Sequence, residues 1–316
     1  MRIVVALGGN ALLRRGEAVS PGAQLRNVKL AAARIAAVAQ GNELVIVHGN
    51  GPQVGLLATL GGSAPASERF PLDVLDAETE GMIGYLIELE LRNRLPASRP
   101  VATLLTMVEV DANDPAFKRP DKPVGPMLTQ NDAASAAQAN GWTVAPDGDG
   151  YRRVVASPRP LRFLEIEPVR ALLAQRAVVI CAGGGGIPVT ADADGQHRGI
   201  EAVVDKDRSA ALLAHEVGAD LFVIATDVDG VYLDWGKPDA RPVRRAHPDS
   251  LAAVRFAAGS MGPKVEAACA FARQSGQRGV IGSLADIDRL VTGEAGTSIS
   301  AANSAANSGV AQGEMR

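Results

Sequence analysis

The sequence has few cysteines, no long apolar run and little net charge, and each shortage excludes a class of protein. Its two cysteines, Cys181 and Cys269, lie in apolar surroundings, so we expect buried thiols in a cytoplasmic setting rather than a disulfide. The longest apolar stretches are far too short to span a membrane. Residues 2–7 are expected to form a core strand and not a signal peptide. A formal net charge of −3 argues against a broad basic face, so neither nucleic acid nor membrane is an expected partner.

Several common motifs are absent as well. No G-x-x-x-x-G-K-[ST] occurs, which excludes a P-loop enzyme. Gly8 and Gly9 lack the G-x-G-x-x-G spacing and no acidic residue closes a second strand, which disfavours a dinucleotide oxidoreductase. The histidines are too dispersed for a zinc site, so no metal site built from protein side chains is predicted. These histidines are His48, His197, His215 and His247.

The sequence does contain alternating short apolar runs and helical patterns. A chain of 316 residues with 47 % hydrophobic residues can bury a sizeable core. Strands buried on both faces are expected at residues 3–7, 43–47, 101–107, 177–182 and 221–225. Helices are expected at 21–40, 76–95, 206–217, 249–258 and 263–274, with Asp76, Glu78 and Glu80 at the start of the second. The alternation predicts an α/β fold, a sandwich around a doubly wound parallel sheet.

Two regions break this pattern. Residues 111–160 hold many prolines, glycines and charges, with one weak helix at 130–140 and a returning strand at 151–155. A segment this long is expected to be functional or to form a small subdomain. After Ile299 the chain is dominated by serine, alanine, asparagine and glycine, which predicts a flexible tail over residues 300–316.

Glycine-rich loops follow four of the expected strands, at residues 8–11, 48–55, 183–188 and 226–230. If the strands are parallel, all four loops lie at one edge of the sheet, where open α/β sheets bind ligands. One such loop is weak evidence, because glycine serves any tight turn. Four at one edge would let backbone N–H groups approach phosphate oxygens closely, so the pattern predicts a phosphorylated ligand.

Nine segments in order along the chain resemble carbamate kinase, a branch of the amino-acid kinase superfamily. The resemblance extends from the first strand to about Ile299. The segments are ALGGNAL (6–12), VHGNGPQVG (47–55), DAETEGMIGY (76–85), KPVGP (122–126), RRVVASP (152–158), CAGGGGIPV (181–189), VDKD (204–207), ATDVDGVY (225–232) and GSMGPK (259–264).

The resemblance implies a three-layer αβα fold over residues 1–299, usually a homodimer, with residues 111–160 as a protruding subdomain over the carbamate pocket. It implies MgATP as the phosphoryl donor and carbamoyl phosphate as the product, usually consumed to make ATP in arginine catabolism. Relatives acting on acetylglutamate or glutamate usually carry a lysine in the first glycine loop. Asn10 occupies that position here and Lys122 would supply the charge, which favours carbamate.

Carbamate is already an anion, so its attack on the γ-phosphorus needs no general base, and catalysis depends on positioning and on neutralising charge. With the resemblance, Lys206 is assigned to the transferring phosphoryl group, Lys264 to the nucleotide phosphates and Lys122 to carbamate or the phosphoryl in flight. Asp207 would hold the lysines. Gly8, Gly9 and Asn10 would line the phosphoryl path, and Gly49, Asn50 and Gly51 the carbamate pocket. The expected nucleotide-binding residues are Thr226, Asp227, Val231, Tyr232 and Met261.

Each residue also has an ordinary structural interpretation. Lys122 could be a solvated loop residue, Lys206 and Asp207 a surface pair, and Asp227 a turn residue. Lys264 is unusual near a helix start, where a cation opposes the helix dipole. The alternative functions are a sibling kinase forming another acyl phosphate and a non-catalytic nucleotide sensor. A sensor would have no need of the transfer lysines.

Overall fold

The computed structural model describes residues 1–12, 17, 20–62, 64–257 and 259–302, apart from the side chains of Asn10, Ala11 and Ala66. Almost all of the tail expected at 300–316 lies outside these residues. The central sheet holds eight strands in the order β15 (Arg245–Ala246), β17 (Thr297–Ile299), β16 (Arg278–Ser283), β12 (Leu221–Thr226), β1 (Arg2–Leu7), β2 (Glu43–His48), β9 (Val178–Ile180) and β3 (Val101–Thr103). Every neighbouring pair is parallel except β16 and β17.

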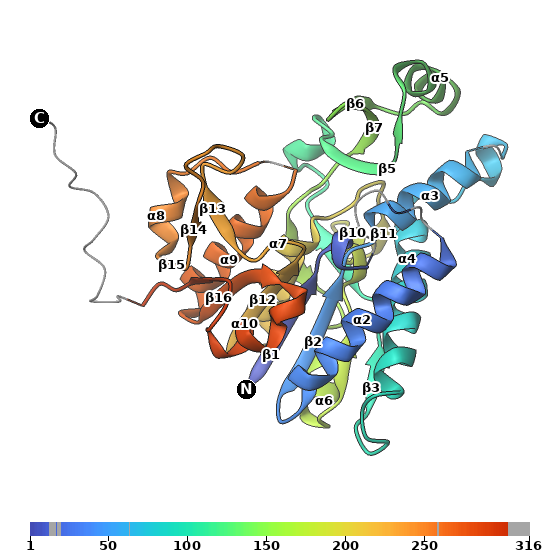
Figure 1. The fold of residues 1–316 in the computed structure, drawn as a ribbon. Helices are drawn as coiled ribbons and strands as arrows, with labels where there is room; N and C mark the ends of the chain where they lie inside the picture. The colour runs from blue at the N-terminus through green and yellow to red at the C-terminus, as the bar shows by residue number, and fades with distance from the viewer. Residues whose placement is uncertain (13–16, 18–19, 63, 258, 303–316) are drawn as a thin grey trace, which may run out of the picture.

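Helices cover both faces of this sheet (Figure 1). Alternate side chains of β1 point to opposite faces, as the pleat requires: Ile3 and Val5 pack in one core cluster, Val4 and Ala6 in the other. The first cluster is completed by α2 (Pro21–Ala39), α4 (Leu72–Arg92) and α10 (Ile287–Thr292), the second by α6 (Ile166–Ala174), α7 (Lys206–Glu216) and α9 (Met261–Ser275). The three-layer αβα fold predicted from the sequence is therefore confirmed.

Smaller elements complete the described part of the chain. A four-stranded sheet has the order β11 (His197–Gly199), β10 (Ile187–Ala191), β4 (Met107–Val110) and β8 (Pro160–Phe163), and β13 (Val231–Leu233) pairs with β14 (Arg241–Val243). Short helices are α1 (Gly9–Leu12), η1 (Ala66–Glu68), η2 (Pro115–Phe117), η3 (Gly183–Gly185), α8 (Pro248–Ala252) and η4 (Leu284–Asp286). Cys181 and Cys269 are buried free thiols, as expected. None of the helices described is long and apolar enough to cross a membrane.

Some expected boundaries are wrong. The apolar run at 101–107 is not one strand, because the chain leaves the central sheet after β3 and enters the four-stranded sheet as β4. The backbone N–H of Thr106, at the crossing point, donates to the Glu80 carboxylate instead of to a strand. The helix expected at 249–258 is shortened to α8 within the described residues. Helix α3 (Gly51–Gly61) and α6 were not predicted.

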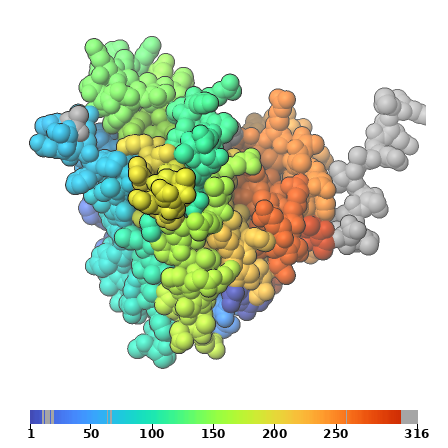
Figure 2. Space-filling model, turned by 180° about the vertical axis from the view of Figure 1, so that it is seen from behind, coloured from blue at the N-terminus to red at the C-terminus, as the bar shows by residue number. Residues whose placement is uncertain are grey.

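Residues 122–155 form a separate layer above the body, shown in green in Figure 1. Its sheet has the order β5 (Lys122–Leu128), β7 (Gly150–Val155) and β6 (Val144–Asp147), and α5 (Gln130–Asn140) matches the weak helix expected there. We call this layer the subdomain. It packs on α3 at a glycine pair, since a Cβ placed on Gly55 would lie 1.9 Å from the Gly125 Cα. In Figure 2, the yellow β10–β11 region lies below the green subdomain on the rear face.

Replacing Gly55 with alanine is expected to disturb this contact. The added Cβ meets backbone atoms of Gly125, which cannot rotate away as a flexible side chain would. We expect the free energy of unfolding to fall by about 1–3 kcal/mol, measured by denaturant titration. The control is Gly61→Ala in the same helix, where a Cβ meets nothing within 4 Å. Equal stability of the two variants would contradict close packing at Gly55.

Candidate active site

The four glycine-rich loops meet at one edge of the sheet, as predicted. Strands β12, β1, β2 and β9 are parallel neighbours, so the residues that follow them emerge together. The Gly8 N–H donates to the Ala225 carbonyl at 2.9 Å. A Cβ on Gly49 would lie 3.2 Å from both the Gly9 nitrogen and the Lys206 Cδ. Glycine at position 49 therefore lets the first two loops and Lys206 come together.

Two of the predicted lysines share one buried carboxylate. Lys206 Nζ donates to Asp207 Oδ1 at 2.5 Å, and Lys264 Nζ donates to Asp207 Oδ2 at 2.9 Å. Lys206 and Asp207 begin α7, whereas Lys264 lies in the first turn of α9. The Asp207 side chain is only 4 % exposed and that of Lys206 11 %, so the interpretation as a surface pair is wrong. The ion pair with Asp207 also explains how the positive charge of Lys264 is tolerated near the start of α9, where it opposes the helix dipole.

The third lysine, Lys122, pairs with a residue that the sequence did not single out. Its Nζ donates to Asp205 Oδ2 at 2.5 Å. The other oxygen of Asp205 accepts the N–H groups of Asp207 and Arg208, which makes Asp205 the N-cap of α7. The available signal was an aspartate directly before an expected helix start. Because its side chain is 30 % exposed and paired, Lys122 is not simply a solvated loop residue.

These five side chains carry three positive and two negative charges, an excess of one positive charge. Burial lowers the pKa of Lys206, and Lys264 lowers it further, although Asp207 opposes the shift. Burial alone would raise the pKa of Asp207, but Lys206 and Lys264 outweigh it and hold that pKa below its ordinary value. The N-terminus of α7 adds a partial positive charge. The cluster is therefore suited to bind an anion.

The third glycine-rich loop forms a turn that only glycine can occupy here. Gly184 has φ +71°, and a Cβ on it would lie 2.2 Å from Asn50 Nδ2. A Cβ on Gly183 would lie 2.4 Å from the His48 ring. The Gly183 N–H donates to Glu80 Oε1 at 2.8 Å. The turn is thus packed directly against residues of the second loop and of α4.

Asn50 is held by α4. Its Nδ2 donates to Asp76 Oδ1 and to Thr79 Oγ1, each at 2.9 Å. All three side chains are buried. Asn50 is one of the residues predicted to line the carbamate pocket, and these two hydrogen bonds set the orientation of its amide.

Three buried titratable groups pack around the second and third glycine-rich loops. Burial lowers the pKa of His48 to about 4, which makes its imidazole neutral at pH 7. Burial raises the pKa of Glu80 to about 8 and that of Asp76 well above its ordinary value. The sequence placed Asp76 and Glu80 at the start of a helix, which is wrong because α4 begins at Leu72. Their spacing of four residues was a signal that they share a helix face.

The remaining predicted residues are less closely grouped. Thr226 ends β12, and its hydroxyl donates to Asp227 at 3.1 Å. Val231 is buried in the core and its backbone N–H donates to Thr297 Oγ1 at 2.8 Å, so neither its side chain nor its N–H is available to a nucleotide. Tyr232 bonds to Asp229. Met261 begins α9, three residues before Lys264. Gly9, Asn10 and Gly51 lie in the first turns of α1 and α3, and the Asn10 side chain is outside the described part.

The pH dependence of the free energy of unfolding should show that Glu80 is protonated in the folded protein. Between pH 4.5 and about 8 the folded protein keeps a proton on Glu80 that the unfolded chain releases, so the contribution of Glu80 to wild-type stability falls as pH rises. Glu80→Gln has no such proton. Its free energy of unfolding relative to wild type should rise by roughly 3 kcal/mol between pH 5 and pH 8, measured by urea titration. Glu78→Gln, at an exposed position of the same helix, is the control. Parallel pH profiles for Glu80→Gln and wild type would contradict a protonated Glu80.

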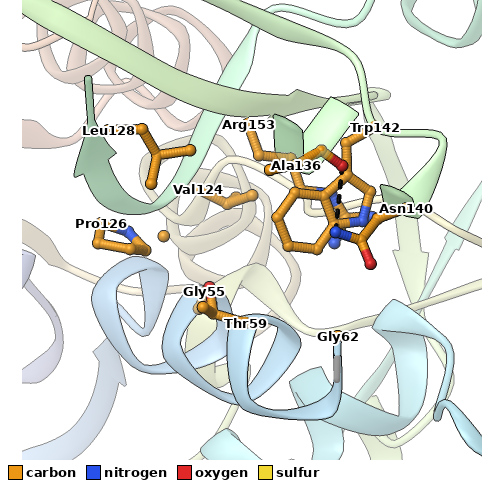
Figure 3. Close-up of a pocket in the computed structure, with 11 residues that line it drawn as sticks. Gly55, Thr59, Gly62, Val124, Pro126, Leu128, Ala136, Asn140, Trp142 and Arg153 are labelled. Atoms are coloured by element: carbon orange, nitrogen blue, oxygen red, sulfur yellow. Dashed lines mark hydrogen bonds between the residues drawn. The ribbon is translucent and has the colours of Figure 1, made fainter. Parts of the chain in front are cut away.

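A cavity of about 120 Å³ lies elsewhere, between α3 and the subdomain. Figure 3 shows Val124, Leu128 and the Trp142 ring on its upper side, with Gly55 and Thr59 of α3 below. The Arg153 guanidinium stacks on Trp142 at 4.7 Å. Lys122, Lys206 and Lys264 are not among the described residues that line it. The cavity therefore belongs to the packing of the subdomain and not to the lysine site.

Comparisons with known proteins identify the family of this chain. Residues 1–283 match the model of the amino acid kinase family. The chain is 56 % identical over 299 residues to carbamate kinase from Haemophilus influenzae, covering 95 % of this chain and 96 % of the relative. It is 52 % identical over 303 residues to carbamate kinase from Rhizobium meliloti, covering 95 % and 93 %.

Solved structures agree as well. Carbamate kinase from Giardia lamblia bound to AMP-PNP has a TM-score of 0.84 at 35 % identity, covering 94 % of this chain and 98 % of that one. The same enzyme bound to citric acid has a TM-score of 0.88 at 36 % identity, covering 94 % and 97 %. The αβα sandwich has a lysine cluster at the carboxyl edge of its central sheet. Together with these relatives, this arrangement identifies the chain as a phosphotransferase. The chain belongs to the amino acid kinase family and, within it, to the carbamate kinases.

Proposed function

We propose that this protein transfers a phosphoryl group reversibly between ATP and carbamate, giving ADP and carbamoyl phosphate. The observation that carries the proposal is the buried cluster in which Lys206 and Lys264 share Asp207 at the carboxyl edge of the sheet. The excess of positive charge suits two anionic reactants and the loose transition state between them. Identity above 50 % to carbamate kinases supports carbamate as the acceptor.

In this proposal each of the three lysines neutralises the negative charge of a different part of the reactants. Lys206 faces the transferring phosphoryl group, Lys264 the nucleotide phosphates and Lys122 the carbamate end. Asp207 holds the first two ammonium groups in place through its two oxygens. No residue removes a proton from carbamate, because the attacking oxygen is already anionic. The cluster therefore acts by preorganised electrostatics.

The substrates occupy the glycine loops. Gly8, Gly9 and Asn10 border the path of the phosphoryl group, and Gly49, Asn50 and Gly51 border carbamate. Thr226, Asp227, Met261, Tyr232 and the backbone carbonyl of Val231 contact the nucleotide. The existence of an AMP-PNP complex of the Giardia enzyme supports a nucleotide as one of the substrates.

Magnesium would enter with the nucleotide. Among the described residues no group of three or more potential metal-ligating side chains forms. Both oxygens of Asp205 and of Asp207 are occupied by ammonium or amide donors. Mg²⁺ held by the phosphate oxygens would neutralise charge there, while the protein supplies the lysines.

We assign residues 1–299 to the kinase domain and residues 111–160 to the segment that overhangs the substrate. The physiological direction is proposed to be ATP synthesis from carbamoyl phosphate during arginine catabolism, in the cytoplasm. The support for direction and location is family membership, since one site catalyses both directions and mass action sets the net flux.

A homodimer is proposed through α4. Its outer face carries exposed apolar side chains one or two turns apart, beside the exposed Leu105. These are Met82, Tyr85 and Leu89, with Tyr85 60 % exposed. We expect Tyr85→Arg to weaken dimerisation at least about 100-fold, because the charge would be buried in an apolar interface. Sedimentation velocity measures this, with Leu161→Arg on β8 as control. A wild-type monomer, or an unchanged dimer in Tyr85→Arg, would contradict the proposal.

The activity is tested by following ATP formation from ADP, Mg²⁺ and carbamoyl phosphate. Turnover with carbamoyl phosphate, and none with acetylglutamyl or glutamyl phosphate, is the expected result. Turnover only with one of the latter would favour a sibling kinase. Nucleotide binding without any turnover would favour a sensor.

A further inference from the structure

Asp205 connects two parts of the molecule that are 83 residues apart in sequence. Its Oδ1 accepts the backbone N–H groups of Asp207 at 3.0 Å and Arg208 at 3.2 Å. Its Oδ2 accepts Lys122 Nζ at 2.5 Å. One carboxylate therefore sets both the start of α7, which carries Lys206, and the position of the first residue of β5.

The lysines of the site follow a common arrangement in which each ammonium donates to a buried carboxylate oxygen. Asp207 serves Lys206 and Lys264, and Asp205 serves Lys122. Within the described residues, Asp205 is the carboxylate that forms an ion pair with Lys122. A lysine side chain is long and flexible, so the free ammonium would populate many positions without this partner.

The segment before α7 also supports the subdomain. The Val203 N–H donates to the Ala156 carbonyl at 3.0 Å, and Val203 packs with Val124 and Val155. Lys122 stands opposite Val155 in the register of β5 and β7. The ion pair of Asp205 with Lys122 therefore adds a charged interaction to the apolar contact that holds β5 and β7 against the rest of the molecule.

We propose that Asp205 is a positioning residue for phosphoryl transfer, which holds the Lys122 ammonium of the subdomain over the substrate site. This inference rests on the proposed function. An ammonium has three N–H donors. One donates to Asp205 Oδ2, and the other two remain for oxygens of carbamate or of the phosphoryl group.

Asp205 stays charged at neutral pH. Burial alone would raise its pKa, but Lys122 and Lys206 together with the Arg208 amide hold that pKa well below its ordinary value. A substitution can separate its two contacts, since asparagine caps a helix about as well as aspartate. Asp205→Asn keeps an oxygen for the α7 amides and removes the negative charge that holds Lys122.

The test is a double-mutant cycle on ATP formation with Asp205→Asn and Lys122→Ala. We expect Asp205→Asn to lower kcat about 10-fold or more, and the double variant to match Lys122→Ala within about 2-fold. The control is Glu201→Gln, which weakens the 3.7 Å pair with Arg153 on the same subdomain and should leave kcat unchanged. Wild-type kcat in Asp205→Asn, or losses that multiply in the double variant, would overturn the proposal.

Hydrogen exchange gives a readout that does not depend on activity. In Asp205→Asn, exchange should quicken at the amides of residues 122–128, other than the two prolines, and of residues 150–155, while the amides of Asp207 and Arg208 stay protected. Unchanged exchange in the two strands would overturn the proposed hold on Lys122. If the wild type makes no ATP, the proposed function fails, and the exchange result still decides whether Asp205 positions the strand of Lys122.

Discussion

Lys206→Met is expected to lower kcat for ATP formation from carbamoyl phosphate about 10³-fold. The side chain is 11 % exposed and lies at the N-terminus of α7, where its ammonium donates to Asp207 and its methylene groups pack against Gly49 of the second glycine-rich loop. Methionine fills a similar volume but carries no charge for the transition state. An initial-rate assay with ADP, Mg²⁺ and carbamoyl phosphate measures the loss.

Lys206→Met should nevertheless fold as well as the wild type. Burial already disfavours the ammonium, and Asp207 keeps Lys264 as its counter-charge. The control is Lys237→Met, which removes an exposed lysine paired with Asp234. A Lys206→Met protein that is folded and retains more than about a tenth of wild-type kcat would remove Lys206 from the transfer step.

Asp207→Asn is expected to reduce both activity and stability. An amide can accept from one lysine through its oxygen, but its NH₂ group would then face the other ammonium. We expect kcat to fall about 100-fold or more and the free energy of unfolding to fall by about 3 kcal/mol at pH 7, because a buried pair loses one partner. Denaturant titration measures the second effect.

The loss of stability in Asp207→Asn should depend on pH in a direction that the pKa of Asp207 sets. The folded pKa of Asp207 lies below its ordinary value of 3.8, so its stabilising contribution is complete above that value. The contribution is lost as pH falls through the lower folded pKa. The stability gap between wild type and Asp207→Asn should therefore close in strong acid. Asp249→Asn, which breaks an exposed pair with Arg273, should shift stability by less than about 1 kcal/mol. A gap that persists in acid would show that the charge of Asp207 is not its cause.

Local pattern was sufficient for much of the fold. Val, Ile and Leu runs without polar alternation predicted β1, β2, β9 and β12, because strands covered on both faces need apolar side chains at every position. The glycines after these strands predicted one shared edge, which the parallel register confirms. The motifs around Lys206 and Lys264 indicated the site, and the roles assigned to these residues remain predictions.

The sequence by itself determined where the chain forms strands and helices and which loops are rich in glycine, since these depend on neighbouring residues. Only the tertiary structure decided the partners of the charged groups. Asp205 meets Lys122 across 83 residues, and Glu80 meets Gly183 across 103. Local periodicity in the sequence does not predict such contacts. Nor does it predict the burial that leaves Glu80 protonated. They depend on how the packed layers bring distant segments together, which is why Asp76 and Glu80, expected at a helix start, lie buried against the second and third glycine-rich loops.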